Sequence, residues 1–162
     1  MKKNRKENAI ECFAIGAMTL LLYIFVPRNK IRDACTIFFS KQLVTWFFGL
    51  LVVEKNLISY PSRLFFKKAI KSSFTFEFFV YPALCVLFNL YYPERRKKWI
   101  KTLYYFAHSG LITGFELYAV TYTNNIYYKK WKWYWTFLTI GFTYYLSRLY
   151  YKWFTKEETP NS

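Results

Sequence analysis

Long apolar runs separated by short basic segments form the main pattern along this chain. A helix needs about 20 apolar residues to cross a bilayer. Five stretches approach or exceed that length, and we expect membrane-spanning helices over residues 9–26, 34–58, 74–92, 100–122 and 133–154. The connections are too short to hold a separate domain. The pattern therefore predicts an all-α, polytopic transmembrane helix bundle forming a single domain over 9–154, with polar tails at 1–8 and 155–162.

Two of the predicted spans contain residues that affect helix geometry. Pro82 lies inside the third span, where its missing N–H should kink the helix or leave a carbonyl that needs another partner. Gly110 and Gly114 lie in the fourth span at GxxxG spacing, which permits close approach of a second helix. We therefore expect this glycine pair to pack against another helix.

The segment between the second and third spans alternates apolar and basic side chains. Pro61 can open a helix, and the residues that follow it are apolar at one set of positions and lysine or arginine at the other. Two interpretations remain for residues 61–72. One is a short helix lying in the headgroup plane, and the other is a solvated linker helix.

Composition and charge agree with a membrane protein. The chain is 54% hydrophobic and 25% aromatic, which leaves more apolar surface than a small globule can cover. A formal charge of +15 would suit nucleic acid, but the basic residues lie mainly in short runs beside the apolar stretches. There they would meet lipid phosphates. We expect a bilayer that includes anionic lipids as the partner, and no nucleic acid.

The number of spans decides the topology. Five spans place the two termini on opposite sides, and the positive-inside rule gives the N-terminal side a small excess, about 12 Lys and Arg against about 10. We therefore expect a multi-pass protein of the plasma membrane with a cytoplasmic N-terminus.

Polar side chains inside the predicted spans are the candidates for a functional site. A charge in hydrocarbon costs several kcal/mol unless it is paired, hydrated or neutralised. The alternating direction of the spans sorts these residues by depth. The half nearer the N-terminal side holds Glu11, Glu54, Glu77 and Glu116, and the other half holds Lys41, Asn89, His108 and Arg148.

Five of these residues have simple structural interpretations. Glu11 and Glu54 lie within about a turn of a span end and should reach water, and Lys41 can extend to the interface in the same way. Asn89 can bond across helices. Arg148 lies about six residues from the nearer end of its span; its long side chain can reach the interface, and a functional role remains the alternative.

The other three residues have open alternatives. Glu77 is either a carboxylate complementing the start of the third helix or a neighbour of Glu116 inside the bundle. Glu116 lies deep in its span, where a hydrogen-bonded carboxyl is either structural or part of a site. His108, the single histidine, makes neither a metal site nor a triad. It is either a packed structural histidine or a proton carrier with Glu116.

Enzymatic, metal and redox chemistry find no support in the sequence. No phosphate loop, nucleophile elbow or HExxH sequence occurs. The three cysteines, Cys12, Cys35 and Cys85, lie in apolar stretches without metal-ligand spacing, so we interpret them as small buried apolar side chains. We expect no enzyme, no metal and no cofactor.

Several segments carry a resemblance to a known group. They are QLVTWFFGLLVVE over 42–54, SFTFEFFVYP over 73–82, FNLYYPE over 88–94, WKWYW over 131–135 and LSRLYYKWF over 146–154. The chain resembles an uncharacterised family of small multi-pass membrane proteins found in spore-forming bacteria. This resemblance covers most of the chain and implies a bacterial plasma-membrane protein, and it brings no activity.

Two classes of function follow. The first is an accessory or assembly subunit that packs its helices against a larger membrane complex or self-associates. The second is a carrier or channel for a proton, cation or small zwitterion. Its candidate site is formed by Glu77, Glu116, His108, Arg148 and Asn89.

Overall fold

The computed structural model describes residues 5–61, 74–123 and 125–155 as a bundle of helices. The helices are α1 Arg5–Phe25, α2 Ile31–Glu54, α3 Tyr81–Leu90, α4 Lys98–Tyr122 and α5 Trp133–Thr155. A 3-10 turn, η1 Arg28–Lys30, leads into α2, and a π-helical segment, η2 Phe76–Val80, leads into α3. Two short strands, β1 Ile58–Ser59 and β2 Tyr127–Tyr128, pair antiparallel.

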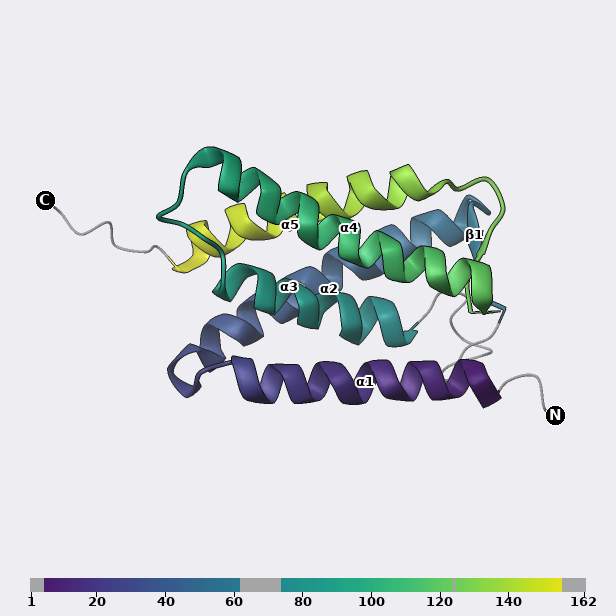
Figure 1. Cartoon of the computed structure of the whole chain (residues 1–162), viewed down its shortest axis with the longest axis horizontal. Coiled ribbons are helices and arrows are strands. Elements are labelled where there is room, and N and C mark those ends of the chain that lie inside the picture. The colour runs from purple at the N-terminus through teal and green to yellow at the C-terminus, as the bar shows by residue number, and fades with distance from the viewer. Residues whose placement is uncertain (1–4, 62–73, 124, 156–162) are drawn as a thin grey trace, which may run out of the picture.

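The helices lie side by side and alternate in direction (Figure 1). In this view α1 forms the lower flank, α4 and α5 form the upper one, and α2 and α3 lie between them. The β1–β2 pair is at the end of the bundle where α1 begins, and α5 finishes at the opposite end. The main helix contacts join α2 to α3, α4 to α5 and α2 to α5.

The all-α prediction is confirmed, and four of the predicted helices are present within a few residues of their expected bounds. The third, predicted over 74–92, is divided into η2 and α3. Two boundaries were wrong. The first helix already begins at Arg5, inside the predicted polar tail. The second ends at Glu54 and not at residue 58, because Asn56 takes a left-handed conformation (φ 54°) and Ile58–Ser59 then pair with β2. The helix predicted over 61–72 lies outside the described residues apart from Pro61.

Pro82 has the consequence expected from its missing N–H. It stands in the first turn of α3, directly after the π-helical segment. The carbonyl of Phe78, four residues earlier, accepts a hydrogen bond from Gln42 Nε2 at 3.2 Å. The neighbouring carbonyl of Glu77 accepts one from Thr45 Oγ1 at 2.8 Å. Side chains of α2 thus satisfy the backbone that the proline disturbs.

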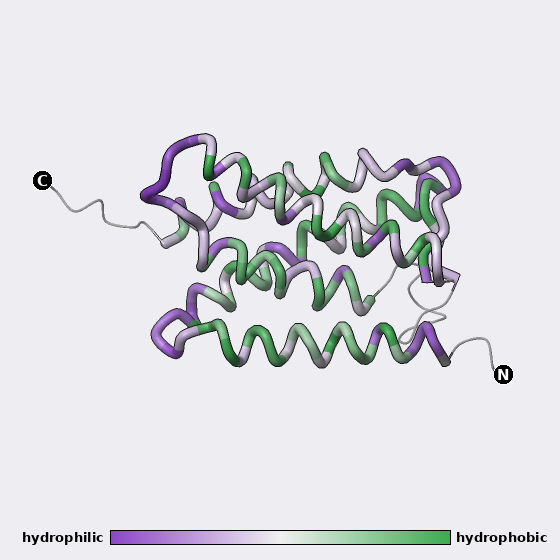
Figure 2. The backbone as a smooth tube through the Cα atoms, viewed as in Figure 1, coloured by the Kyte–Doolittle hydropathy of each residue, from purple (hydrophilic) through white to green (hydrophobic). Residues whose placement is uncertain are grey.

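The core lies at the centre of the bundle and is rich in aromatic rings. Phe88 is fully buried, and its ring centroid lies 4.6 Å from that of Tyr144 and 4.9 Å from that of Tyr105. Many large hydrophobic side chains face outward on the helices. Figure 2 shows hydrophilic connections at both ends and hydrophobic residues along the helices between them, most clearly in α1. That distribution suits a bilayer around the bundle.

Two helices of the described chain, Lys6–Phe25 and Arg28–Glu54, are long and apolar enough to cross a membrane when judged by length and composition. A third apolar helix, Phe76–Leu90, is shorter.

The expected packing of the α4 glycines is wrong within this chain. Gly110 and Gly114 face outward, and a Cβ built on either would meet nothing within 4 Å. The opposite face of α4 makes the contact instead: a Cβ on Gly141 of α5 would lie 3.4 Å from Ser109 Oγ. GxxxG spacing permits close approach but does not select the side of the helix that packs.

Candidate functional site

Glu116 is the centre of a polar cluster near the β1–β2 end of the bundle. Its carboxylate accepts hydrogen bonds from the Tyr128 hydroxyl at 2.5 Å, from Thr136 Oγ1 at 2.8 Å and from the Tyr81 hydroxyl at 3.3 Å. These donors come from β2, α5 and α3, while Glu116 itself lies on α4. One carboxylate therefore joins four elements that are distant in sequence.

Glu77 lies in the same cluster, as the sequence suggested. Burial raises the pKa of Tyr60 well above its ordinary value, and the charges of Glu77 and Glu116 raise it further. The Tyr60 side chain also hydrogen-bonds Glu77. Burial and the Glu116 charge likewise raise the pKa of Tyr128. We call this group the Glu77–Glu116 cluster; it comprises Tyr60, Glu77, Tyr81, Glu116, Tyr128 and Thr136.

A glycine makes room for the Glu77 carboxyl group. A Cβ on Gly49 of α2 would lie 2.4 Å from Glu77 Oε2 and 2.5 Å from both Glu77 Cδ and Oε1. The Glu77 carboxyl thus rests directly on the α2 backbone. Any side chain at residue 49 would displace it.

We expect Gly49→Ala to perturb the Glu77–Glu116 cluster. The added methyl should force the Glu77 side chain to move and should cost about 1 kcal/mol, despite the higher helix propensity of alanine. Gly110→Ala and Gly114→Ala are matched controls, because they add a methyl to an equally helical position with open space. Thermal unfolding in detergent should show a lower midpoint for Gly49→Ala alone. An unchanged or raised midpoint would mean that Glu77 relocates without cost.

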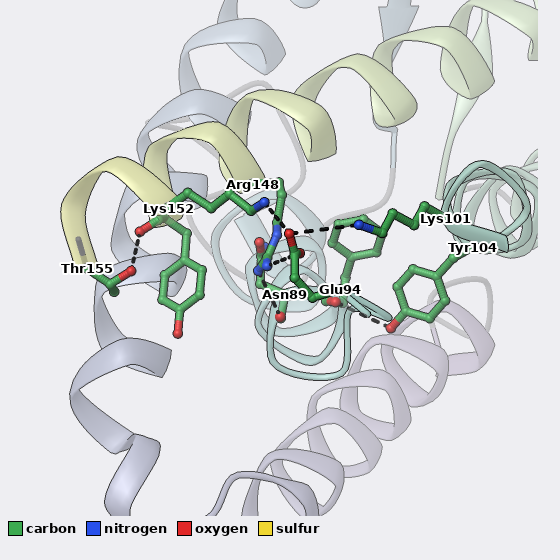
Figure 3. A network of polar contacts seen from close by, with 9 residues as sticks. Asn89, Glu94, Lys101, Tyr104, Arg148, Lys152 and Thr155 are labelled. Atoms are coloured by element: carbon green, nitrogen blue, oxygen red, sulfur yellow. Dashed lines mark hydrogen bonds and ion pairs between the residues drawn. The ribbon is translucent and has the colours of Figure 1, made fainter. Parts of the chain in front are cut away.

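A second polar cluster lies at the opposite end of the bundle, around Glu94 (Figure 3). Arg148 of α5 donates to Glu94 Oε2 at 2.6 Å and to the Asn89 carbonyl at 3.3 Å. Lys152 also hydrogen-bonds Glu94, and the Lys101 ammonium lies 3.9 Å from the same carboxylate. The loop between α3 and α4 is thereby bound to the last turns of α5.

The structure adds two details here. The Arg148 side chain is only 8% exposed and extends to Glu94 in the loop between α3 and α4, and its guanidinium lies 4.6 Å from the centre of the Tyr92 ring. Glu94 was missed in the sequence. The available signal was a lone acid beside the basic run Arg95 to Lys98, in a connection between two spans.

The Glu94 cluster predicts a pH dependence. Partial burial alone would raise the pKa of Glu94, but hydrogen bonds and charges from Lys152 and Arg148 together hold it below its ordinary value of 4.5. A depressed carboxyl pKa stabilises the fold above the unfolded-state pKa, and that contribution is lost as pH falls through the folded-state pKa. Unfolding midpoints in detergent should therefore decline below about pH 5. The decline should be smaller in Glu94→Gln; identical profiles would contradict the assignment.

Asn89 bonds across helices as expected. Its Nδ2 atom donates to Ser147 Oγ of α5 at 3.2 Å and to the Cys85 carbonyl at 3.0 Å. The buried Cys85 thiol donates to Ser147 Oγ at 3.1 Å. The other two cysteines, Cys12 and Cys35, are exposed, which corrects their interpretation as buried.

His108 is held apart from the acidic cluster. Its Nδ1 lies 2.9 Å from the Tyr104 carbonyl, and its ring packs against Phe88 and Tyr104 with centroids 5.2 and 4.2 Å away. Among the described residues no contact joins it to Glu116. The geometry supports a packed structural histidine and not a proton relay with Glu116.

Two charged residues expected at the interface are buried instead. Lys41 is 1% exposed, and Glu11 is 2% exposed with one carboxylate oxygen 2.5 Å from Thr75 Oγ1. Both lie on faces of α1 and α2 that meet the bundle. Glu54 is exposed at the end of α2, as expected.

The described polar side chains hold charged groups in hydrogen-bonded clusters. No group of three His, Cys, Asp or Glu side chains that could hold a metal occurs in the described part of the chain. Two clusters of polar side chains lie one at each end of the bundle, with the Asn89 contacts beside the second, and the Lys41–Thr143 and Glu11–Thr75 contacts lie outside both clusters. No family model, curated protein or solved structure matches the chain.

Proposed function

We propose that this chain is a five-span protein of a bacterial plasma membrane. The two helices that are long and apolar enough to cross a membrane support this, together with the lengths of α4 and α5, which have 25 and 23 residues. At 1.5 Å per residue these are about 38 and 35 Å long, enough for a hydrocarbon core of about 30 Å. Their exposed faces carry Tyr and Trp, which have low hydropathy yet favour membrane interfaces.

The five-span topology is tested by its termini. Reporters fused at Met1 and Ser162 should report different compartments, with the N-terminal reporter in the cytoplasm. The alternating helices agree with this expectation, because α1 begins and α5 finishes at opposite ends of the bundle (Figure 1). Two reporters in one compartment would remove the five-span proposal.

Within the membrane we propose that the protein is an accessory or assembly subunit. The observation that carries this is the use of its polar groups: Glu116, Glu94 and Asn89 all bond across the bundle's own helices. Such contacts hold a bundle together. The outward faces of the helices are apolar and aromatic. On α4 they include Gly110 and Gly114, where no side chain of the described residues covers the helix backbone. That surface suits contact with helices of a larger complex.

Cross-linking and purification from native membranes tests this role. A discrete membrane protein should co-purify with the wild type, and Gly110→Leu with Gly114→Leu should reduce its yield. The same change at Gly16 of α1, where a Cβ also meets nothing within 4 Å, is the matched control. The stability of the isolated protein should stay unchanged in both variants. Purification only as a monomer would contradict the accessory role.

One observation favours a second candidate, a carrier or channel for a proton or cation. Glu77 and Glu116 lie in one buried cluster with three tyrosine hydroxyls, and carboxylates inside a bundle are frequent elements of ion pathways. Glu116→Gln separates the two roles. In a carrier, this substitution should abolish proton or cation transport. In an accessory subunit, it should leave the yield of the co-purified partner unchanged.

A further inference from the structure

Lys41 is a buried cation without a carboxylate partner. It lies on α2, is 1% exposed, and forms no ion pair within the described residues. Its ammonium donates to Thr143 Oγ1 at 2.5 Å and lies 4.8 Å from the centre of the Tyr144 ring. An ammonium has three donors. One hydroxyl and a ring face compensate only part of the cost of burying this charge.

The position of Lys41 along α2 restricts which anion can act as its counter-charge. The residue lies ten positions after Ile31 and thirteen before Glu54. These intervals correspond to about 15 and 20 Å along α2. Since the hydrocarbon core is about 30 Å thick, Lys41 lies near mid-bilayer in the five-span arrangement. Lipid phosphates stay at the surface, so an anion at this depth has to be carried by a protein helix.

A groove leads to this lysine from the outside of the bundle. It lies between α2 and α5, has a volume of about 680 Å³, and includes Lys41 and Thr143 in its lining. Its rim is formed by large apolar side chains that face outward, among them Phe39, Leu43 and Phe154. An apolar rim around a cation and a hydroxyl suits a membrane helix that carries one acidic residue.

Within the described residues a second copy of this chain does not offer that acid. Glu7, Glu11, Glu77 and Glu116 lie on inward faces. Asp33 and Glu54 lie at the two ends of α2, and Glu94 lies in the loop between α3 and α4, all far from mid-depth. The acid that complements Lys41 is therefore carried by a different protein.

We propose that the α2–α5 groove receives a transmembrane helix of another protein, and that an Asp or Glu near the middle of that helix pairs with Lys41. This inference rests on the proposed accessory function and adds a second contact surface to the α4 face at Gly110 and Gly114. On docking, the Lys41 side chain, which is 1% exposed in the free chain, turns toward the groove. The partner carboxylate then accepts hydrogen bonds from the Lys41 ammonium and supplies its missing counter-charge. Apolar side chains of the partner helix cover the rim of the groove.

A designed helix tests the pairing. The full chain is reconstituted in phosphatidylcholine nanodiscs with a labelled Leu/Ala-rich transmembrane peptide that carries one central Glu, and association is measured by energy transfer. A peptide with Leu at the central position is the reference. The Glu peptide should bind wild type roughly tenfold more tightly than the Leu peptide, as expected for a charged hydrogen bond between membrane helices.

Three variants of the chain test whether the preference for the Glu peptide depends on Lys41 and on the α2–α5 groove. Lys41→Met should remove the preference for the Glu peptide, and it should unfold no more easily than wild type because an unpaired buried charge is removed. Val44→Trp keeps Lys41 and fills the groove, so it should weaken binding of both peptides. Lys55→Met, at the exposed C-terminal end of the same helix, should behave as wild type.

The outcomes separate this inference from the proposed function. Equal binding of the Glu and Leu peptides to wild type, or a preference that persists in Lys41→Met, would overturn the pairing. Binding of a fluorescent fatty acid that requires Lys41, without a peptide preference, would assign the groove to a lipid and would also overturn it. If Lys41→Met still co-purifies the native partner at the wild-type yield, the accessory function stands and this contact surface is wrong.

Discussion

Glu94→Gln should destabilise the protein by about 2–3 kcal/mol, measured by equilibrium unfolding in mixed micelles. Glutamine retains the size and one acceptor of the side chain but removes the charge that three cations share. Arg148, with a side chain only 8% exposed, would then be buried without a counter-charge. Breaking a fully buried pair costs about 3–5 kcal/mol, and the 38% exposure of the Glu94 side chain reduces that cost.

The opposite substitution is the control for this prediction. Arg148→Met replaces the buried cation with an apolar side chain, while Glu94 keeps Lys152 and Lys101 as partners. Its cost should be clearly smaller than that of Glu94→Gln, because Glu94 is not left alone. The double variant should be more stable than Glu94→Gln by itself. Equal losses from the two single variants would indicate that the pair contributes only as a surface ion pair.

The sequence predicted the helices well because their signal is local. Apolar runs of the required length, broken by basic residues and turn residues, mark the five helices within a few residues. The effect of Pro82 was also predictable, since a missing N–H frees a carbonyl wherever the helix lies. The donor to that carbonyl, Gln42 of another helix, was not predictable.

The orientation of each helix was harder to predict because α4 and α5 are apolar and aromatic on several faces. Gly110 and Gly114 supplied the most visible motif, yet Ser109 packs against Gly141 on the other face of α4. The same uncertainty misplaced Lys41 and Glu11. Their distance from the span ends suggested that these side chains reach water. The direction in which each helix presents them could not be predicted, and in the structure both point into the bundle.

The shared location of Glu77 and Glu116 was predictable because depth alone was sufficient. The predicted alternation of spans assigned both residues to the half nearer the N-terminal side, and the cost of placing a carboxylate against lipid favours an inward orientation. The partners could not be inferred in the same way. Tyr60 and Tyr128 reach the carboxylates through the β1–β2 pair, whose strands are only two residues long. Strands of that length leave no alternating pattern to recognise.

Glu116 should show a large difference between two substitutions, because three hydroxyl groups depend on its carboxylate. Glu116→Leu removes the acceptor for Tyr128, Thr136 and Tyr81 inside the bundle. Each stranded donor costs about 1–3 kcal/mol unless it finds another acceptor. Since Thr136 and Tyr128 also lie within 3.2 Å of each other, part of that cost is recovered. We expect a net loss of about 3 kcal/mol.

Glu116→Gln tests whether acceptor geometry or charge is responsible for the stability. The amide oxygen can still accept from Thr136 or Tyr128, while the NH2 group meets donors and loses the remaining contacts. The cost should be about 1 kcal/mol, well below that of Glu116→Leu, in unfolding experiments in micelles. Glu116→Leu as stable as wild type would mean that the three hydroxyls find other acceptors. Equal losses from Gln and Leu would show that the negative charge itself, and not hydrogen-bond acceptance, joins α3, α4, α5 and β2.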